Sequence, residues 1–264
     1  PNFSFIDAPF NLSTYVEGDY KTEVAYMGCR TRVLANVVDP KKAITTGRGN
    51  LSFTSINLPR LGIKYGILNN EKADLDGFFK ELEEKMDIVK EQLLERFKLQ
   101  SNKRAYNFPF LIQQGVWMDG EKLKPTDKLG KIIKHGTLSI GFIGLAETLK
   151  ALIGKHHGES KEAQELGLKI IGFMRDKCDE YAKEKNLNFT LLATPAEGLS
   201  GRFTRIDQAV FGKIKGITDK DYYTNSFHIP VYAKISAADK IKREAKYHAL
   251  TNAGHITYIE LDGD

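Results

Sequence analysis

One residue of this sequence has both the type and the position of a reactive group. Cys29 lies between two runs rich in β-branched residues, 22–27 and 31–38, which predict two strands joined by a tight loop. The glycine before it permits a sharp turn and leaves room around the sulfur. Arg30 and Arg32 are placed to lower the pKa of the thiol, because nearby cations favour the thiolate. The residues alone leave two interpretations open, a catalytic Cys29 or a turn cysteine packed under the sheet.

A second candidate is the segment Thr194–Gly198, which follows a predicted strand. Thr194 suits an N-cap, Pro195 the first helical position and Glu197 the third, which together form a capping box. A helix start after a strand also offers free backbone N–H groups and a positive dipole end to a phosphate. The segment is therefore either a helix cap or a phosphate site.

The other polar candidates each have a plain structural alternative. Asn50 in a glycine-rich loop either orients a substrate hydroxyl or closes a turn. His228 lies between Phe227 and Ile229, so a core histidine is the default interpretation. Cys178 lies on the apolar side of a predicted helix and is expected to be buried, because free cysteine is among the most buried residue types. No metal site is proposed in this chain.

These residues need a scaffold, and the periodicity of the apolar residues predicts one. Strands are expected at 51–58, 138–143 and 188–193 and after Gly254, with a strand or extended loop at 225–233. Helices are expected at 75–97 and 145–153, and from Ser160 and Ser236. Alternating strands and helices indicate an α/β fold with mostly parallel strands in one domain.

Length and composition exclude several classes of protein. The 264 residues include 39 Lys and Arg and 34 Asp and Glu, a net charge of +5. The basic residues alternate with acidic ones, which favours solvated helix faces over a nucleic-acid surface. Two cysteines exclude a disulfide scaffold and a cysteine-only zinc site within the chain. No membrane span or signal peptide is visible, so a cytoplasmic protein is expected. Both ends are interpreted as cuts through a larger polypeptide.

Several short motifs occur together in a fixed order along this chain. They are Tyr26–Thr31, Arg48–Asn50, Ser55–Arg60, Thr194–Glu197 and Tyr223–Val231. In this order they resemble the catalytic core of the anaerobic, class III ribonucleoside-triphosphate reductases, which are glycyl-radical enzymes. The resemblance covers essentially the whole chain, 1–264, and implies part of a ten-stranded α/β barrel with a cysteine finger loop.

The resemblance implies a radical reduction of ribonucleoside triphosphates to deoxyribonucleoside triphosphates. It places Cys29 at the tip of the finger loop, as the thiyl radical that takes hydrogen from C3′ of the ribose. Asn50 and Thr31 would face the ribose. Thr194, Pro195, Ala196, Glu197 and Gly198 would hold the phosphates, and Ser226 and His228 would line the same cavity. Loss of the 2′-hydroxyl as water, reduction and return of the hydrogen would complete the reaction.

The chain also departs from the family's pattern. Nothing in it matches the radical-bearing glycine motif, the four zinc-binding cysteines near the C-terminus, the second active-site cysteine or the N-terminal nucleotide-sensing region. The resemblance implies a glycyl radical and a zinc ion elsewhere in the full-length enzyme, a radical-SAM iron–sulfur activating protein and a homodimer. No nucleic acid or membrane partner is expected. We predict that this piece alone is inactive and does not close a barrel.

Two alternative functions remain from the residues. The helix start and the positive charge also fit a non-catalytic nucleotide-binding module. Cys29 with His228 would suit an ordinary cysteine-nucleophile enzyme. The electron donor, formate or a protein dithiol, is left open.

Overall fold

A three-stranded parallel sheet forms the centre of the molecule. The computed structural model describes residues 4, 6–28 and 30–259. The strands β3 (Asn50–Asn57), β4 (Thr137–Ile143) and β5 (Asn188–Ala193) pair in the order β3-β4-β5. The register pairs Ser139 of β4 with Phe53 and Thr190 on either side. The fold class, α/β with parallel strands, is confirmed.

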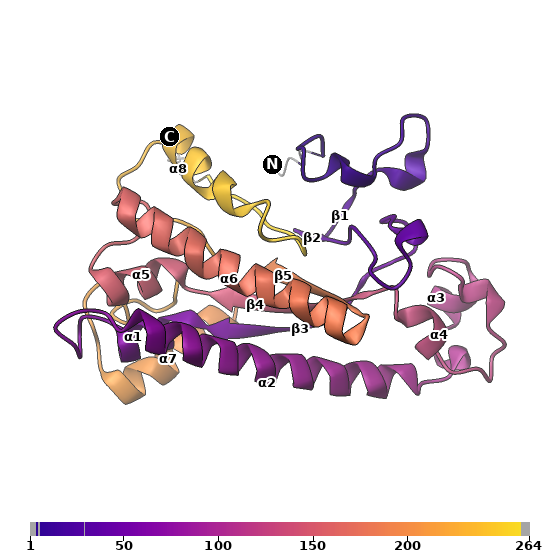
Figure 1. Cartoon of the computed structure of the whole chain (residues 1–264), viewed down its shortest axis with the longest axis horizontal. Helices are drawn as coiled ribbons and strands as arrows, with labels where there is room; N and C mark the ends of the chain where they lie inside the picture. Colours follow the sequence, from indigo (N-terminus) through magenta and orange to yellow (C-terminus); the bar gives the residue numbers. More distant parts are fainter. Residues whose placement is uncertain (1–3, 5, 29, 260–264) are drawn as a thin grey trace.

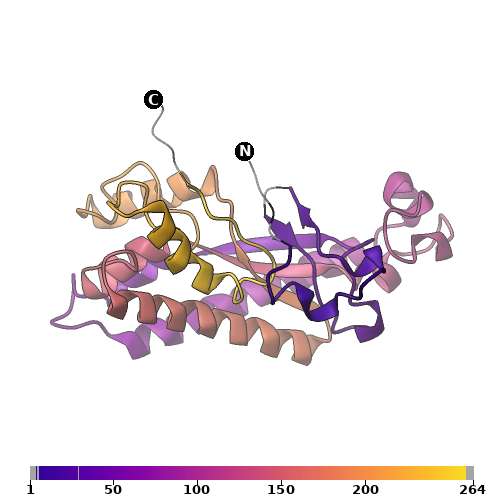
Figure 2. The same ribbon diagram turned by 90° about the horizontal axis from the view of Figure 1, so that it is seen from above.

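Long helices cover one face of this sheet. The connections run through α1 (Leu58–Tyr65), α2 (Leu75–Ser101), α3 (Pro109–Gln113), α4 (Gly130–Ile133), α5 (Leu145–Ile153), α6 (Lys161–Lys185), α7 (Leu199–Phe211) and α8 (Ala237–Glu244). Helices α2 and α6 lie along the same side of the sheet (Figures 1 and 2). Short 3₁₀ helices cover Leu12–Thr14, Tyr20–Thr22, Pro40–Lys42, Ala105–Asn107, Gly120–Lys122 and Ala245–Tyr247.

The core lies between the sheet and these two helices. Alternate residues of the strands point into it, because side chains of a strand alternate between its two faces. The strand residues in this core are Ile56, Leu138, Ile140, Phe142, Phe189, Leu191 and Ala193. Helix α2 adds Phe78, Leu82, Met86, Val89 and Leu93, and α6 adds Ile170, Ile171, Met174 and Cys178. Cys178 is fully buried, as predicted.

A small hairpin near the N-terminus lies beside β5, and a segment near the C-terminus packs between the two. Its strands β1 (Tyr26–Met27) and β2 (Thr31–Arg32) are antiparallel. The main chain of Ala253 accepts from the N–H of Arg32 and donates to the carbonyl of Leu191, with N···O distances of 2.9 Å each. The segment 252–254 therefore ties the hairpin to the edge of β5. Figure 1 shows the N-terminal and C-terminal segments above the same side of the sheet.

Most predicted elements are confirmed, and most of the differences lie toward the two ends of the chain. The predicted strands 22–27 and 31–38 are much shorter, because Ala35 adopts a left-handed conformation with φ of 56° and stops β2 from continuing. The segment 225–233 is a loop that forms a single bridge, from Asn225 to Ile143. Residues 255–259 form no strand, and 260–264 lie outside the described residues. Helix α1 was not predicted.

Within the residues that the structure describes, no helix is long and apolar enough to cross a membrane.

Candidate functional site

The face of the sheet away from α2 and α6 is mostly polar. Its residues on β4 and β5 are buried, and its polar residues on β3 are half-buried. Seven alternate strand positions carry hydrogen-bonding side chains, and one carries no side chain at all. They are Asn50, Ser55, Asn57, Thr137, Ser139, Gly141, Asn188 and Thr190. A buried polar group is costly unless it is hydrogen-bonded, so a row of such groups on one face indicates a site rather than a core.

Two rows of hydrogen bonds cross this face. In the first, the Asn50 amide donates to the Ser139 hydroxyl, which lies 2.9 Å from the hydroxyl of Thr190. In the second, the hydroxyls of Ser55 and Thr194 are 2.7 Å apart. The second row passes over Gly141, two residues beyond Ser139, so the rows are roughly 7 Å apart along the strands.

The hydroxyls of the second row occupy the space that a side chain at position 141 would need, so only glycine fits there. A Cβ at this position would overlap the Thr194 hydroxyl and would lie 2.7 Å from the Ser55 hydroxyl. Real Cβ atoms do not approach other atoms that closely, so any other residue here would push the Thr194 side chain away. The glycine therefore fixes where Thr194, the first residue of the predicted phosphate segment, lies.

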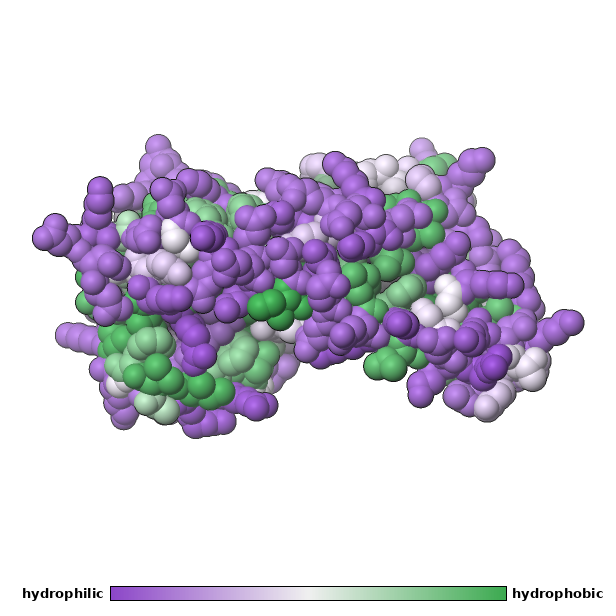
Figure 3. Space-filling model, turned by 60° about the horizontal axis from the view of Figure 1, so that its bottom comes forward, coloured by the Kyte–Doolittle hydropathy of each residue, from purple (hydrophilic) through white to green (hydrophobic). Residues whose placement is uncertain are grey.

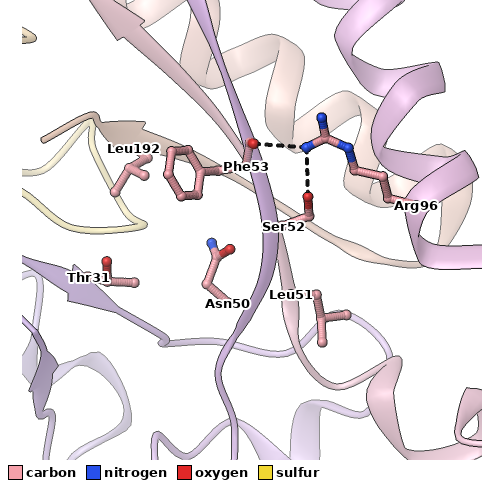
Figure 4. Close-up of a pocket in the computed structure, with 7 residues that line it drawn as sticks. All are labelled: Thr31, Asn50, Leu51, Ser52, Phe53, Arg96 and Leu192. Carbon is pink, nitrogen blue, oxygen red and sulfur yellow. Dashed lines mark hydrogen bonds between the residues drawn. The ribbon is translucent and has the colours of Figure 1, made fainter. Parts of the chain in front are cut away.

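A hollow of about 420 Å³ opens at the β3 edge of this face. Thr31 of the hairpin, Asn50 and Phe53 of β3 and Leu192 of β5 line it on one side of β3 (Figure 4). On the other side, Arg96 of α2 donates to the Ser52 hydroxyl and the Phe53 carbonyl, at 3.0 and 3.1 Å. Thr31 and Asn50 are 19 residues apart in the sequence, and both line this hollow. Cys29, two residues before Thr31, lies outside the described residues.

The loop before Asn50 is held by a buried arginine. The guanidinium of Arg48 donates to the carbonyls of His135, Ile44 and Ala35, with N···O distances of 2.7, 2.9 and 2.7 Å. Burial lowers the pKa of Arg48 to about 10, so the side chain remains charged at neutral pH. Arg48 therefore orients the start of β3, and with it Asn50.

The predicted capping box at Thr194 is wrong. Helix α7 begins at Leu199 with Gly198 at its N-cap, and no side chain caps it. The Thr194 hydroxyl bonds to Ser55 instead. Ala196 is left-handed, with φ of 57°, which separates the end of β5 from the helix. The segment 194–198 is therefore a loop that leads into an uncapped helix N-terminus. The Glu197 side chain in this loop is exposed.

The segment with Ser226 and His228 lies beside this loop. The Asn225 amide donates to the Pro195 carbonyl at 2.5 Å, and the main chain of Ser226 accepts from Leu145 at 3.1 Å. Ser226 is buried with φ of 42°, and its hydroxyl has no hydrogen-bond partner among the described residues. The two predicted substrate segments therefore meet at the carboxyl ends of β4 and β5.

His228 is paired with a buried carboxylate that the sequence did not reveal. Its Nδ1 lies 3.3 Å from Oε2 of Glu244, whose other oxygen accepts from the Ile229 N–H at 2.8 Å. Burial lowers the pKa of His228, and its ring nitrogen Nδ1 faces the Glu244 carboxylate. Its Nε2 is buried without a partner among the described residues.

Sequence reasoning missed Ser55, Ser139, Thr190, Arg48 and Glu244. One signal was available for part of this set, since β4 places small or polar residues at every second position (Thr137, Ser139, Gly141) within an otherwise apolar strand. Glu244 gave none, because only the fold brings α8 to His228. Across residues 4, 6–28 and 30–259, no group of three or more His, Cys, Asp or Glu side chains is arranged to hold a metal ion.

Comparisons with known proteins agree on one family. The family model described as "Anaerobic ribonucleoside-triphosphate reductase" matches residues 1–264. Relatives with that name are 37% identical over 248 residues in Salmonella typhimurium and 36% identical in Escherichia coli, each across 93% of this chain. The relative from Enterobacteria phage T4 is 34% identical across 90% of this chain.

Solved structures show the same fold. The anaerobic ribonucleotide reductase from Thermotoga maritima with citrate in its active site matches with a TM-score of 0.58 and 16% identity, across 80% of this chain and 35% of that one. The same enzyme in complex with dATP and CTP matches with a TM-score of 0.59 and 16% identity, across 83% of this chain and 33% of that one. The chain spans about a third of the length of the curated relatives it matches, 33% for the two enterobacterial ones.

Proposed function

The chain belongs to the anaerobic ribonucleoside-triphosphate reductase family, and we propose that it forms the substrate-holding middle of such an enzyme's catalytic core. The enzyme would reduce ribonucleoside triphosphates to deoxyribonucleoside triphosphates. The observation that carries the proposal is the polar face of the sheet, on which Thr31 and Asn50 line one hollow while Thr194 and Ser226 lie at the carboxyl ends of β4 and β5.

The first polar row is proposed to bind the ribose. The amide of Asn50 lines the hollow. It donates to the Ser139 hydroxyl, which is itself hydrogen-bonded to Thr190, so the amide has a fixed orientation. An amide can both donate to and accept from vicinal hydroxyls, which suits the 2′- and 3′-hydroxyls. Thr31 lines the same hollow, so it is proposed as the second ribose contact.

The second row and the loop after it are proposed to bind the phosphates. Thr194, Pro195, Ala196, Glu197 and Gly198 lead to the uncapped N-terminus of α7, where backbone N–H groups and the helix dipole favour an anion. Asn225, the residue before Ser226, donates its amide to the Pro195 carbonyl of this loop, and His228 lies three residues after Asn225. The Nε2 of His228 has no hydrogen-bond partner among the described residues, and it is proposed to contact the phosphates directly or through a bridging water. Glu197 is exposed and is proposed as a polar contact rather than a cap.

The reaction is proposed to begin at Cys29, as a thiyl radical. The sulfur takes the hydrogen atom from C3′, which forms an S–H bond and leaves a carbon radical. The 2′-hydroxyl then leaves with a proton as water, two electrons and a proton from a separate donor reduce the sugar, and Cys29 returns the hydrogen to C3′. Cys178 is not that donor, because it is buried among apolar side chains and burial raises the pKa of its thiol.

The remainder of the enzyme is proposed to surround this chain, which forms one catalytic-core fragment over 1–264. Large hydrophobic side chains are exposed on it, including Phe53 on β3 and Val210 on α7. Figure 3 shows hydrophobic patches on two lobes with a hollow between them. Exposed apolar patches mark surfaces that another part of a protein covers.

The groups that generate the radical are proposed to lie outside this chain. The proposal includes a glycyl radical, a zinc site, a radical-SAM iron–sulfur activating protein and a homodimer of the full-length subunit.

The test uses the full-length enzyme, charged by its activating protein. Cys29→Ser is expected to abolish deoxyribonucleotide formation while the glycyl radical, measured by electron paramagnetic resonance, still forms. Asn50→Ala is expected to lower kcat by about 10- to 100-fold, since it removes a substrate-orienting group. Retained turnover in Cys29→Ser contradicts the proposal. Nucleotide binding without turnover in the wild-type enzyme would favour a non-catalytic nucleotide-binding module instead.

A further inference from the structure

Two buried arginines follow the Cys29 turn, and they make different contacts. Arg30 and Arg32 are 0% and 2% exposed. Removing a guanidinium from water is costly unless several hydrogen bonds compensate. Their partners therefore show what each arginine holds in place.

Arg30 bonds to the end of β5. Its Nη1 lies 3.3 Å from the carbonyl of Ala193 and 3.4 Å from that of Thr194, and its Nη2 donates to the Tyr258 hydroxyl at 2.7 Å. The guanidinium carbon is 5.5 Å from the centre of the Tyr258 ring. Ala193 ends β5 and Thr194 opens the candidate phosphate loop, so one side chain joins the residue after Cys29 to that loop.

Arg32 bonds to other segments. Its Nε donates to the Asn252 carbonyl at 3.1 Å, and its Nη1 donates to the Asn11 side chain. Its guanidinium carbon is 4.9 Å from the centre of the Phe10 ring. Arg32 therefore holds the hairpin to the terminal segments, and none of these contacts reaches Thr194.

The main chain supports the Arg30 contact at a glycine. Thr31 pairs with Gly254, which has φ of 120°. A Cβ on Gly254 would overlap the carbonyl oxygen of Arg30. The hairpin can approach β5 this closely only because position 254 has no side chain.

We infer that Arg30 is a positioning residue, which fixes the turn that carries Cys29 relative to the Thr194–Gly198 loop. The inference rests on the proposed function, in which Cys29 reacts at the ribose while this loop holds the phosphates of the same nucleotide. The planar guanidinium reaches two carbonyls and a hydroxyl at once, whereas a lysine ammonium cannot reproduce that fork. A displacement of about 1 Å between the reacting groups can cost about 100-fold in rate.

The experiment compares Arg30→Lys with the matched variant Arg32→Lys in the full-length enzyme. For each we would measure kcat and KM for one ribonucleoside triphosphate, per glycyl radical counted by electron paramagnetic resonance. Arg30→Lys is expected to lower kcat by about 30- to 100-fold with KM changed less than about 3-fold, because the nucleotide still binds while the sulfur is misplaced. Arg32→Lys is expected to change kcat by less than about 3-fold.

A milder variant tests the same contact if Arg30→Lys fails to fold. Tyr258→Phe removes only the hydroxyl that accepts from Arg30, on a side chain that is partly exposed. It is expected to lower kcat by about 3- to 10-fold with KM unchanged, since it loosens one of three bonds of the guanidinium. An unchanged kcat in both Arg30→Lys and Tyr258→Phe overturns the inference. Equal losses of kcat in Arg30→Lys and Arg32→Lys also overturn it, because they indicate only a weaker hairpin.

A second measurement separates this inference from the proposed function. Hydrogen exchange of the backbone amides over 26–32 is followed in the unliganded full-length protein. Exchange at 28–31 is expected to be faster in Arg30→Lys than in Arg32→Lys, and equal rates contradict the positioning role. A wild-type protein that binds nucleotide but never reduces it refutes the proposed function, whereas the exchange experiment still tests whether Arg30 holds the turn.

Discussion

The two faces of the central sheet are built from the same three strands and have opposite chemistry. Toward α2 and α6, β4 presents Leu138, Ile140 and Phe142, which belong to the main core. On the other face the same strand presents Thr137, Ser139 and Gly141. Every residue of β4 is buried, so burial alone does not distinguish the faces. One face stabilises the fold and the other holds a network of hydrogen bonds around an open hollow.

The comparison shows how a single strand separates stability from function. Apolar burial contributes about 25 cal/mol per Å², and it comes from the helix side. The polar side contributes little net stability, because its hydrogen bonds replace bonds to water. Variants on the apolar face should therefore lower stability most, whereas variants on the polar face should lower activity more than stability.

The largest effect is expected on the apolar face. Phe142→Ala leaves a cavity in the core and is expected to lower stability by about 3–5 kcal/mol. Ser139→Ala on the polar face is expected to cost only about 1 kcal/mol, although it leaves Asn50 and Thr190 without their shared partner. Thermal unfolding of the full-length protein would measure both, and an equal or reversed order would break the comparison.

A smaller effect is expected when the polar face is crowded. Gly141→Ala displaces Thr194 from Ser55 and is expected to cost about 1–3 kcal/mol, with a fall in kcat/KM larger than the fall in stability predicts. The matched control is Gly172→Ala on α6, where a Cβ would meet nothing within 4 Å. That variant is expected to be neutral or to gain about 0.5–1 kcal/mol. Unchanged activity in Gly141→Ala would contradict the role given to Thr194.

Acid is expected to weaken the edge at which the hairpin packs. His248 and His255 stack with ring centres 4.0 Å apart, and His255 lies edge-on to Tyr26. Burial lowers the pKa of His248 to about 4 and that of His255 to about 2, with a further lowering from His248 in the second case. Unfolded histidine has a pKa near 6.5, so below that pH the unfolded chain binds protons that the folded one does not.

Stability should therefore fall as the pH decreases from about 6.5 toward 4, by about 1–2 kcal/mol for His248 at pH 5. The measurement is the melting temperature at several pH values. His248→Gln should reduce the slope between pH 6.5 and 4.5, and the slope that remains is expected from His255. A profile with the same slope in that variant would show that other groups cause the acid sensitivity.

The smallest effect is expected at Cys178, on the apolar face. It is fully buried, and burial raises the pKa of its thiol. Iodoacetamide at pH 8 is expected to leave Cys178 unmodified in the native protein and to alkylate it after denaturation. Peptide mapping by mass spectrometry measures the alkylated fraction of Cys178. Rapid alkylation in the native protein would contradict the prediction and show that the core opens.

The fold was largely predictable because its elements are locally encoded. The three-to-four-residue spacing of apolar residues in α2 and the caps Ser160 and Ser236 predicted helices that the structure contains. The predictions failed where the conformation depends on distant partners. The left-handed Ala35 bonds to Arg48, and the segment after Thr194 is shaped by Ser55 and Asn225.

The candidate site was only partly predictable. Short motifs predicted Asn50, Thr31, Thr194 and Ser226 as site residues, and their roles stay predictions. In the structure Thr31 and Asn50 line one hollow, while Thr194 and Ser226 lie near the carboxyl ends of β4 and β5. Glu244 and the contacts of Arg30 could not be inferred, because their partners lie 16 residues away for His228 and more than 160 away for Ala193 and Thr194. The sequence alone does not show which distant residues become hydrogen-bond partners in the folded protein.

The sequence by itself determined the long helices α2 and α6, the three parallel strands and the resemblance to the family, since periodicity, caps and ordered motifs are local properties of the chain. The tertiary structure alone decided which residues share the polar face. Parallel strands far apart in sequence meet there in one register, which pairs Asn50 with Thr137 and brings its amide within reach of the Ser139 hydroxyl. The hydroxyl of Thr194 lies over Gly141. The physical reason is that hydrogen bonds between side chains act over about 3 Å, a distance that only packing can set.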